Sequence, residues 1–174
     1  MQRSSYIVRL WWGCLVTACI GPAACAERLP AAVNAELNGY MQVCREAGGK
    51  PDAARAVTTL DFTGDGIADF LLDVGSLDCQ DAWSVFGDRQ KPVSVFVGDG
   101  RGGAKQAFAD TTYGVSIGRQ GAATRLWITV AGQDCGKPAA RDFASEHFCE
   151  RSLVWKAALQ RFDLAPVASA RMIE

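Results

Sequence analysis

The chain contains, from Thr59 to Asp73, the stretch TLDFTGDGIADFLLD. Three carboxylates recur in it at every fourth position, Asp61, Asp65 and Asp69, around a Gly-Asp-Gly turn. Apolar runs flank the turn on both sides, so the stretch predicts two β-strands joined by a loop that is rich in oxygen ligands. A hard cation such as calcium takes about six to eight oxygen ligands. The spacing therefore predicts a calcium-binding loop.

Counting positions along this loop gives five predicted metal ligands. They are the side chains of Asp61, Thr63, Asp65 and Asp69 and the backbone carbonyl of Ile67. Leu72 stands where an EF-hand has its bidentate glutamate, and the flanks have the pattern of strands rather than helices, so the loop is not an EF-hand. Without that glutamate we expect weak binding, with a Kd of about 10⁻⁴–10⁻³ M.

A second interpretation of the same loop needs no metal. Aspartate side chains accept hydrogen bonds from the backbone amides of the turns in which they lie. Gly64 and Gly66 would then be required only for the shape of the backbone. The sequence favours calcium and leaves this metal-free turn as the alternative.

Two motifs together resemble a known repeat. The first is DFTGDGIADFLL at residues 61–72, and the second is VSVFVGDGRGG at residues 93–103. Over residues 57–108 the chain resembles one FG-GAP or VCBS-type repeat, the unit that builds the blades of extracellular β-propellers. The resemblance implies a blade-like sheet with calcium at the three aspartates, and with Thr63 where the repeat more commonly has Asn or Asp.

The number of repeats limits what this resemblance implies. A propeller needs several blades, and no second Asp-rich loop is present in the sequence. The resemblance therefore implies a single blade-like sheet. The overall layout is also similar to small exported proteins of proteobacteria, which pair a Cys-bearing N-terminal helix with one such loop and a C-terminal Trp hairpin.

The rest of the chain predicts one helix and about six or seven short strands. Residues 31–47 place apolar side chains at near-helical spacing, and Gly48-Gly49 ends that helix. The clearest strands are predicted at residues 56–62, 67–74, 92–98 and 125–131, with a hairpin over 152–164. We expect an α+β, mainly β fold, in which the N-terminal helix packs on a mostly antiparallel, blade-like sheet.

The first 26 residues resemble an export signal. Basic residues precede an apolar run at Leu10–Ile20, and Ala24-Cys25-Ala26 fits a cleavage site. The run is shorter than the roughly 20 residues of a membrane-spanning helix, and no second run follows, so we expect no transmembrane segment. The sequence predicts one periplasmic or secreted domain over residues 27–174. A lipid anchor on Cys19, within a lipobox-like stretch, is the alternative.

Four cysteines remain after the predicted signal, namely Cys44, Cys79, Cys135 and Cys149. An even number in an exported protein indicates two disulfides. Three pairings are possible, and we favour Cys44–Cys79 and Cys135–Cys149. Free thiols are the alternative, and a zinc site is disfavoured because no two of these cysteines have Cys-x-x-Cys spacing.

The composition limits the classes of partner. The chain has 18 Lys and Arg residues against 19 Asp and Glu and no basic run, which excludes nucleic acid as an expected partner. We expect a monomeric, non-enzymatic module that is stabilised by calcium and binds an unknown envelope protein or glycan. Trp83, Trp127 and Trp155 are predicted to lie in the core or to be half-buried, and Cys79, Trp83 and Phe86 are expected to pin the irregular segment 75–89 to the core. A carbohydrate or partner surface is the alternative for these tryptophans.

A small exported hydrolase is the alternative function. Residues 114–118 match the Gly-x-Ser-x-Gly motif around Ser116, and Asp134 or Asp142 and then His147 follow in the order found in α/β-hydrolases. A paired-carboxylate mechanism could instead use Asp69 and Asp73, but four residues along a strand span about 13 Å. This function requires Ser116 to lie near His147, or two carboxylates to lie close together.

Overall fold

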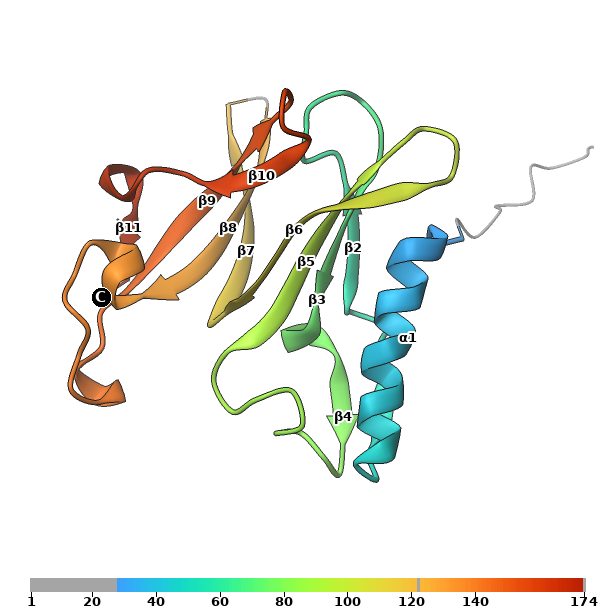
Figure 1. Cartoon of the computed structure of the whole chain (residues 1–174), viewed down its shortest axis with the longest axis horizontal. Coiled ribbons are helices and arrows are strands. Elements are labelled where there is room, and N and C mark those ends of the chain that lie inside the picture. The colour runs from blue at the N-terminus through green and yellow to red at the C-terminus, as the bar shows by residue number, and fades with distance from the viewer. Residues whose placement is uncertain (1–27, 122, 174) are drawn as a thin grey trace, which may run out of the picture.

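The computed structural model describes residues 28–121 and 123–173, and it arranges them in three layers (Figure 1). Helix α1 (Ala31–Glu46) covers one face of a four-stranded sheet, and a second sheet packs on the other face. The described residues form one α-helix and eleven strands, and all strand pairs are antiparallel. The predicted α+β, mainly β fold class is confirmed. The predicted signal at 1–26 and the lipidation alternative at Cys19 lie outside the described residues.

Helix α1 forms where the apolar spacing predicted it. Its buried residues Val33, Leu37 and Cys44 lie on the face that packs against the sheet. The helix ends before Gly48, whose φ of 84° is a left-handed conformation that glycine adopts at little cost. None of the helices in the described part of the chain is long and apolar enough to cross a membrane.

The two central strands of the first sheet are buried on both faces. Its strand order is β2 (Val57–Leu60), β3 (Asp69–Asp73), β5 (Lys91–Gly98) and β6 (Ala104–Thr112). Successive side chains of a strand point to opposite faces. The two buried sets are Leu71, Val93 and Val95 toward the second sheet, and Phe70, Leu72 and Phe96 toward α1. Burial on both faces explains the unbroken apolar run in β3.

The second sheet continues directly from the first. Its order is β10 (Arg161–Leu164), β9 (Phe148–Lys156), β8 (Ala123–Ala131) and β7 (Gly114–Gln120), and β11 (Arg171–Met172) also pairs with β9. The chain crosses between the sheets at Tyr113. The hydroxyl of the buried Thr112 lies 2.7 Å from the Gly114 carbonyl oxygen and 2.8 Å from that of Thr129, so it fixes this corner.

Short elements outside the two sheets complete the fold. Strands β1 (Lys50–Asp52) and β4 (Asp78–Gln80) pair as a two-stranded ribbon beside the end of α1 (Figure 1). Neither three-residue strand was predicted, because each is too short to show alternation. Four short 3-10 helices follow at η1 (Val74–Ser76), η2 (Gly132–Cys135), η3 (Phe143–Ser145) and η4 (Val167–Ser169).

Two disulfides join the pairs that the sequence favoured. Cys44–Cys79 links α1 to β4 with a Cα–Cα distance of 5.8 Å, and Cys135–Cys149 links η2 to β9 with 5.7 Å. All four cysteines are buried. Each bond therefore fixes a short peripheral element to a larger one.

The three tryptophans of the described residues occupy different environments. Trp127 is buried between strands, and the half-buried Trp155 packs on Phe162 with ring centroids 5.0 Å apart. Trp83 is 83% exposed, so the prediction that it pins segment 75–89 to the core is wrong. The other two predicted anchors hold the segment: Cys79 is bonded to Cys44, and the ring of Phe86 packs edge-on against Tyr40 of α1.

Candidate metal-binding loop

The predicted metal loop is the turn of the β2–β3 hairpin. Leu60, the last residue of β2, pairs with Asp69, the first residue of β3, and residues 61–68 form the loop between them. Gly64 and Gly66 have φ angles of 83° and 82°, which glycine adopts far more readily than other residues. These two glycines give the loop the sharp reversal that the sequence predicted.

Asp69 is fully buried and binds backbone amides from two different turns. Its Oδ2 atom accepts hydrogen bonds from the amides of Phe62 and Thr63, both at 2.9 Å. Its Oδ1 atom accepts one from the amide of Gly98, at 3.1 Å, at the end of β5. One carboxylate therefore joins the start of the β2–β3 loop to the hairpin that β5 forms with β6.

The contact with Gly98 depends on the absence of a side chain there. A Cβ atom at Gly98 would lie 2.1 Å from the carbonyl oxygen of Ala68, a clash that only a shift of the backbone could relieve. Glycine thus lets β5 approach the residue next to Asp69. No local sequence pattern indicates this close approach, because Gly98 and Ala68 are far apart in the sequence.

Asp61 and Asp65 also accept hydrogen bonds from their own turn. The carboxylate of Asp61 accepts from the amides of Gly64 at 2.6 Å and Gly66 at 2.9 Å, and from the Thr63 hydroxyl at 3.3 Å. Asp65 makes one such bond, which its Oδ1 atom accepts from the amide of Ile67 at 2.8 Å. Asp65 is exposed and is the least constrained of the three aspartates.

These environments shift the pKa values of two loop carboxyls in opposite directions. Burial raises the pKa of Asp69, and the amide hydrogen bonds from Gly98, Phe62 and Thr63 oppose that rise only in part. At Asp61 the effect of burial also favours the neutral acid, but the amides of Gly66 and Gly64 outweigh it, so the pKa is lowered. The more exposed carboxylate is therefore the one that more strongly favours its ionised form.

The chemical types of the predicted ligands fit a hard cation, because all of them are oxygens. Hydrogen bonds bring Asp61, Thr63 and Asp69 together, whereas Asp65 and Ile67 bond only to each other among these five. In the described ranges, no three Asp, Glu, His or Cys side chains form a group that could hold a metal. The described geometry is thus an amide-capped turn, and the three carboxylates would have to move closer together to share one cation.

A second carboxylate-capped turn lies beside the loop. The Oδ1 atom of Asp99 accepts from the amides of Arg101 at 2.8 Å and Gly103 at 2.9 Å, and these bonds lower the pKa of Asp99. A hollow of about 420 Å³ opens between the two turns and is lined largely by glycines, among them Gly66, Gly98, Gly100 and Gly103. Solvent and ions can therefore reach the loop from this side.

The residues of the alternative hydrolase do not form a catalytic group. The Ser116 hydroxyl donates to Oε1 of Glu150 at 2.7 Å. Ser116 pairs with Trp127 on β8, whereas Phe148, the neighbour of His147, pairs with Ala131. These two positions on β8 are about 13 Å apart along the strand.

The aspartates of that alternative have structural partners. Asp134 lies 3.8 Å from the guanidinium of Arg151, and Asp142 accepts from the amide and hydroxyl of Ser145. Asp73 accepts from the amide of Gly75 and the hydroxyl of Ser76 at the start of η1, and it makes no bond to Asp69. Each of these carboxylates therefore supports a local turn or an ion pair.

No protein-family model matches the chain, and no curated protein or solved structure matches it either. The function of the loop is therefore inferred from its own residues.

Proposed function

We propose that this protein is an exported, non-enzymatic binding domain of the cell envelope, in which the loop at 61–69 binds calcium as a structural cation. The observation that carries this proposal is the bonding of Asp69. Because its carboxylate joins the loop to the β5–β6 hairpin, a cation that orders the loop also orders this end of the first sheet. The resemblance of residues 57–108 to one FG-GAP or VCBS-type repeat supports the same role.

Two features support export. Disulfides persist in oxidising compartments, and the protein has two of them, both buried. The signal-like residues 1–26 agree with such a location, which would be the periplasm or the outside of the cell. The partner in that location is an envelope protein or glycan.

Each loop residue has a distinct part in this proposal. Although burial raises the pKa of Asp61, the amide hydrogen bonds from Gly66 and Gly64 lower it overall, so its carboxylate brings negative charge to the turn. The exposed carboxylate of Asp65 accepts one hydrogen bond, from the amide of Ile67, and would supply a second charge to calcium. The carboxylates of one turn repel each other, and the turn amides compensate this repulsion only in part. A bound divalent cation would compensate the rest.

The first prediction concerns Asp65→Asn. An Asn side chain keeps the oxygen that accepts from Ile67 but loses the charge, so the metal-free protein should unfold at the same temperature as the wild type. At 10 mM calcium, a Kd of about 10⁻⁴–10⁻³ M would stabilise the wild type by about 1–3 kcal/mol. Thermal unfolding with calcium and with chelator should show a shift of about 3–10 °C that the variant lacks.

A matched control is Asp52→Asn. Asp52 is an exposed aspartate whose Oδ1 atom accepts from the amide of Ala54, the same two-residue bond as at Asp65 but in strand β1. This variant should keep the full calcium shift. A wild-type unfolding temperature that is the same with calcium and with chelator would refute the calcium proposal.

A further inference from the structure

The segment between β4 and β5 carries the most exposed large apolar side chain of the described residues. Trp83 is 83% exposed, and the next in order, Leu159, is 59% exposed. Burying an indole would recover free energy, because apolar surface is more stable out of water. Tryptophan is also the residue type most enriched among those that dominate binding energies. The exposure of Trp83 therefore makes this segment a candidate binding surface.

The segment is anchored on both sides of Trp83, so the exposure of the indole is not the result of a loose loop. Before it, Cys79 is bonded to Cys44 of α1. After it, the ring of Phe86 lies 5.8 Å from that of Tyr40, also of α1. Tight turns connect the two anchors, and in these turns backbone amides bond to carbonyls three residues earlier. The backbone thus presents the indole in a fixed place, which lowers the entropic cost of binding.

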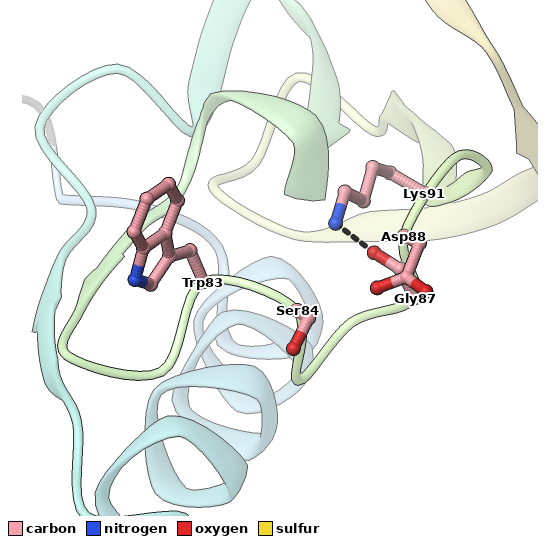
Figure 2. A pocket seen from close by; sticks show the side chains of 5 residues that line it. All are labelled: Trp83, Ser84, Gly87, Asp88 and Lys91. Atoms are coloured by element: carbon pink, nitrogen blue, oxygen red, sulfur yellow. Dashed lines mark hydrogen bonds between the residues drawn. The ribbon is translucent and has the colours of Figure 1, made fainter.

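Two hollows open beside this indole. One has a volume of about 260 Å³ and is lined by Trp83, Ser84, Gly87, Asp88 and Lys91 (Figure 2). The other, of about 370 Å³, shares Trp83 and Lys91 and adds Arg55, Ser76 and Asp78 among its polar residues. In Figure 2 the ring of Trp83 lies at one side of the view and Lys91 at the other, where the Lys91 ammonium donates to the carbonyl of Gly87. We call Trp83 and these two hollows the Trp83 platform.

We propose that the Trp83 platform binds an uncharged saccharide. A pyranose ring has an apolar face of C–H bonds, whose slight positive charge complements the negative face of the indole. Its hydroxyl groups radiate from the ring edge, where Ser84, Asp88 and Lys91 offer donors and acceptors. Few polar groups around one apolar surface are the usual composition of a small-molecule site.

The charges of the platform support an uncharged ligand. Arg55 and Lys91 are balanced by Asp78 and Asp88. A nucleic acid or another polyanion would require a clear excess of positive charge. A protein partner would require an apolar centre of several residues, yet Trp83 is the one large apolar side chain that is exposed among the described residues 75–91. A saccharide needs only the single stacking face that this surface presents.

This inference rests on the proposed function as a binding domain and narrows its partner to a glycan. It is independent of the calcium loop, because no residue of the Trp83 platform belongs to residues 61–69. The two proposals can therefore fail separately. Binding would be measured both with calcium and with chelator, so that loss of the calcium effect and loss of saccharide binding are distinguishable.

The second prediction is that the protein binds an uncharged saccharide through Trp83. Calorimetric titration of the full chain would use two tetrasaccharides, one of β-1,4-linked glucose and one of β-1,4-linked N-acetylglucosamine. At least one should bind saturably. Trp83→Ala should weaken this binding by about tenfold or more, since stacked aromatic residues dominate such interfaces. The affinity of Trp83→Phe should lie between those of the wild type and Trp83→Ala, because phenylalanine keeps a smaller aromatic face.

Folding and binding are separated by the controls. Because Trp83 is so exposed, the unfolding temperature of Trp83→Ala should stay within about 2 °C of the wild type. Leu159→Ala removes another exposed apolar side chain, outside the platform, and should bind as the wild type does. The inference is overturned if neither saccharide binds saturably up to about 10 mM, or if Trp83→Ala binds as tightly as the wild type.

Discussion

At the scale of single residues, Asp69 shows how one side chain can hold two hairpins together. Its three partners are backbone amides that no strand ladder would otherwise satisfy at this end of the sheet. A buried amide without a partner costs about 1–3 kcal/mol. The carboxylate also carries a cost, because burial raises its pKa. The bonds to the amides are therefore what keeps a charged group acceptable at this position.

The third prediction is that Asp69→Asn destabilises the fold by about 2–3 kcal/mol. The two carboxylate oxygens of Asp69 accept from different amides, one from those of Phe62 and Thr63 and the other from that of Gly98. Asparagine has only one acceptor oxygen, so its NH₂ group would face an amide donor on the other side. Urea unfolding in the presence of chelator measures the change without any contribution from calcium.

Asp99→Asn is the matched control for that measurement. Asp99 also accepts from two amides, but both bonds fall on the same oxygen, which asparagine retains. Asp99 is exposed, and its variant should keep the urea midpoint of the wild type. Equal midpoints for Asp69→Asn and the wild type would contradict the role assigned to Asp69.

At the scale of elements, the two disulfides fix structures that the sheets alone do not hold. Cys44–Cys79 joins α1 to the β1–β4 ribbon, which has only two short strands. A polar bridge fixes the same helix against the first sheet, where Glu36 accepts from the Ser94 hydroxyl at 2.6 Å and from the Gln106 side-chain amide at 2.9 Å. Helix α1 is thus attached to the first sheet by its buried apolar face and the charge-assisted bonds of Glu36, and to the ribbon by the disulfide.

The fourth prediction compares the two disulfides. Their sequence separations are 35 and 14 residues. In the chain-entropy model, the longer closed loop contributes about 4 kcal/mol and the shorter about 3 kcal/mol. The double variant with Cys44→Ala and Cys79→Ala should therefore lose more free energy of unfolding than the variant with Cys135→Ala and Cys149→Ala. The reverse order in urea unfolding would show that strain or packing, rather than loop closure, governs their effect.

Sequence patterns predicted the elements better than their assembly. Alternation predicted strands near β5 and β8, and a short apolar run predicted one near β3, because both patterns are visible within a single segment. The division of the strands between two sheets depends on the corner at Tyr113, where contacts with Thr129 fix the turn. Such contacts join residues that are far apart in the sequence, so no local pattern contains them.

The same limit applies to the candidate site. The sequence predicted the loop and its aspartates from spacing alone, but the third partner of Asp69 is Gly98, 29 residues away. Trp83 was predicted to lie in the core or to be half-buried, with a carbohydrate or partner surface as the alternative. The structure leaves it exposed, since Cys79 and Phe86 already anchor the segment on either side.

At the scale of the whole molecule, the three layers place the first sheet at the centre (Figure 1). Its inner strands β3 and β5 have a hydrogen-bonded neighbour on each side and a buried layer on each face. The second sheet has only one packed face against the first, and β11 is a two-residue exposed strand at its margin. Stability should therefore decrease outward from β3 and β5, because local opening exposes least apolar surface at the edges.

The fifth prediction is that native-state amide hydrogen exchange follows this order. Amides of Leu71, Leu72 and Val95 should exchange only through global unfolding, and so about a thousandfold or more slowly than those of β11. Low concentrations of urea should speed the exchange of these central amides, with the same dependence on urea as global unfolding. The exchange rates of the edge amides should not change. If the amides of β9 and β10 exchanged more slowly than those of β3 and β5, the second sheet would be the most stable part of the fold. Helix α1 would then contribute little to global stability.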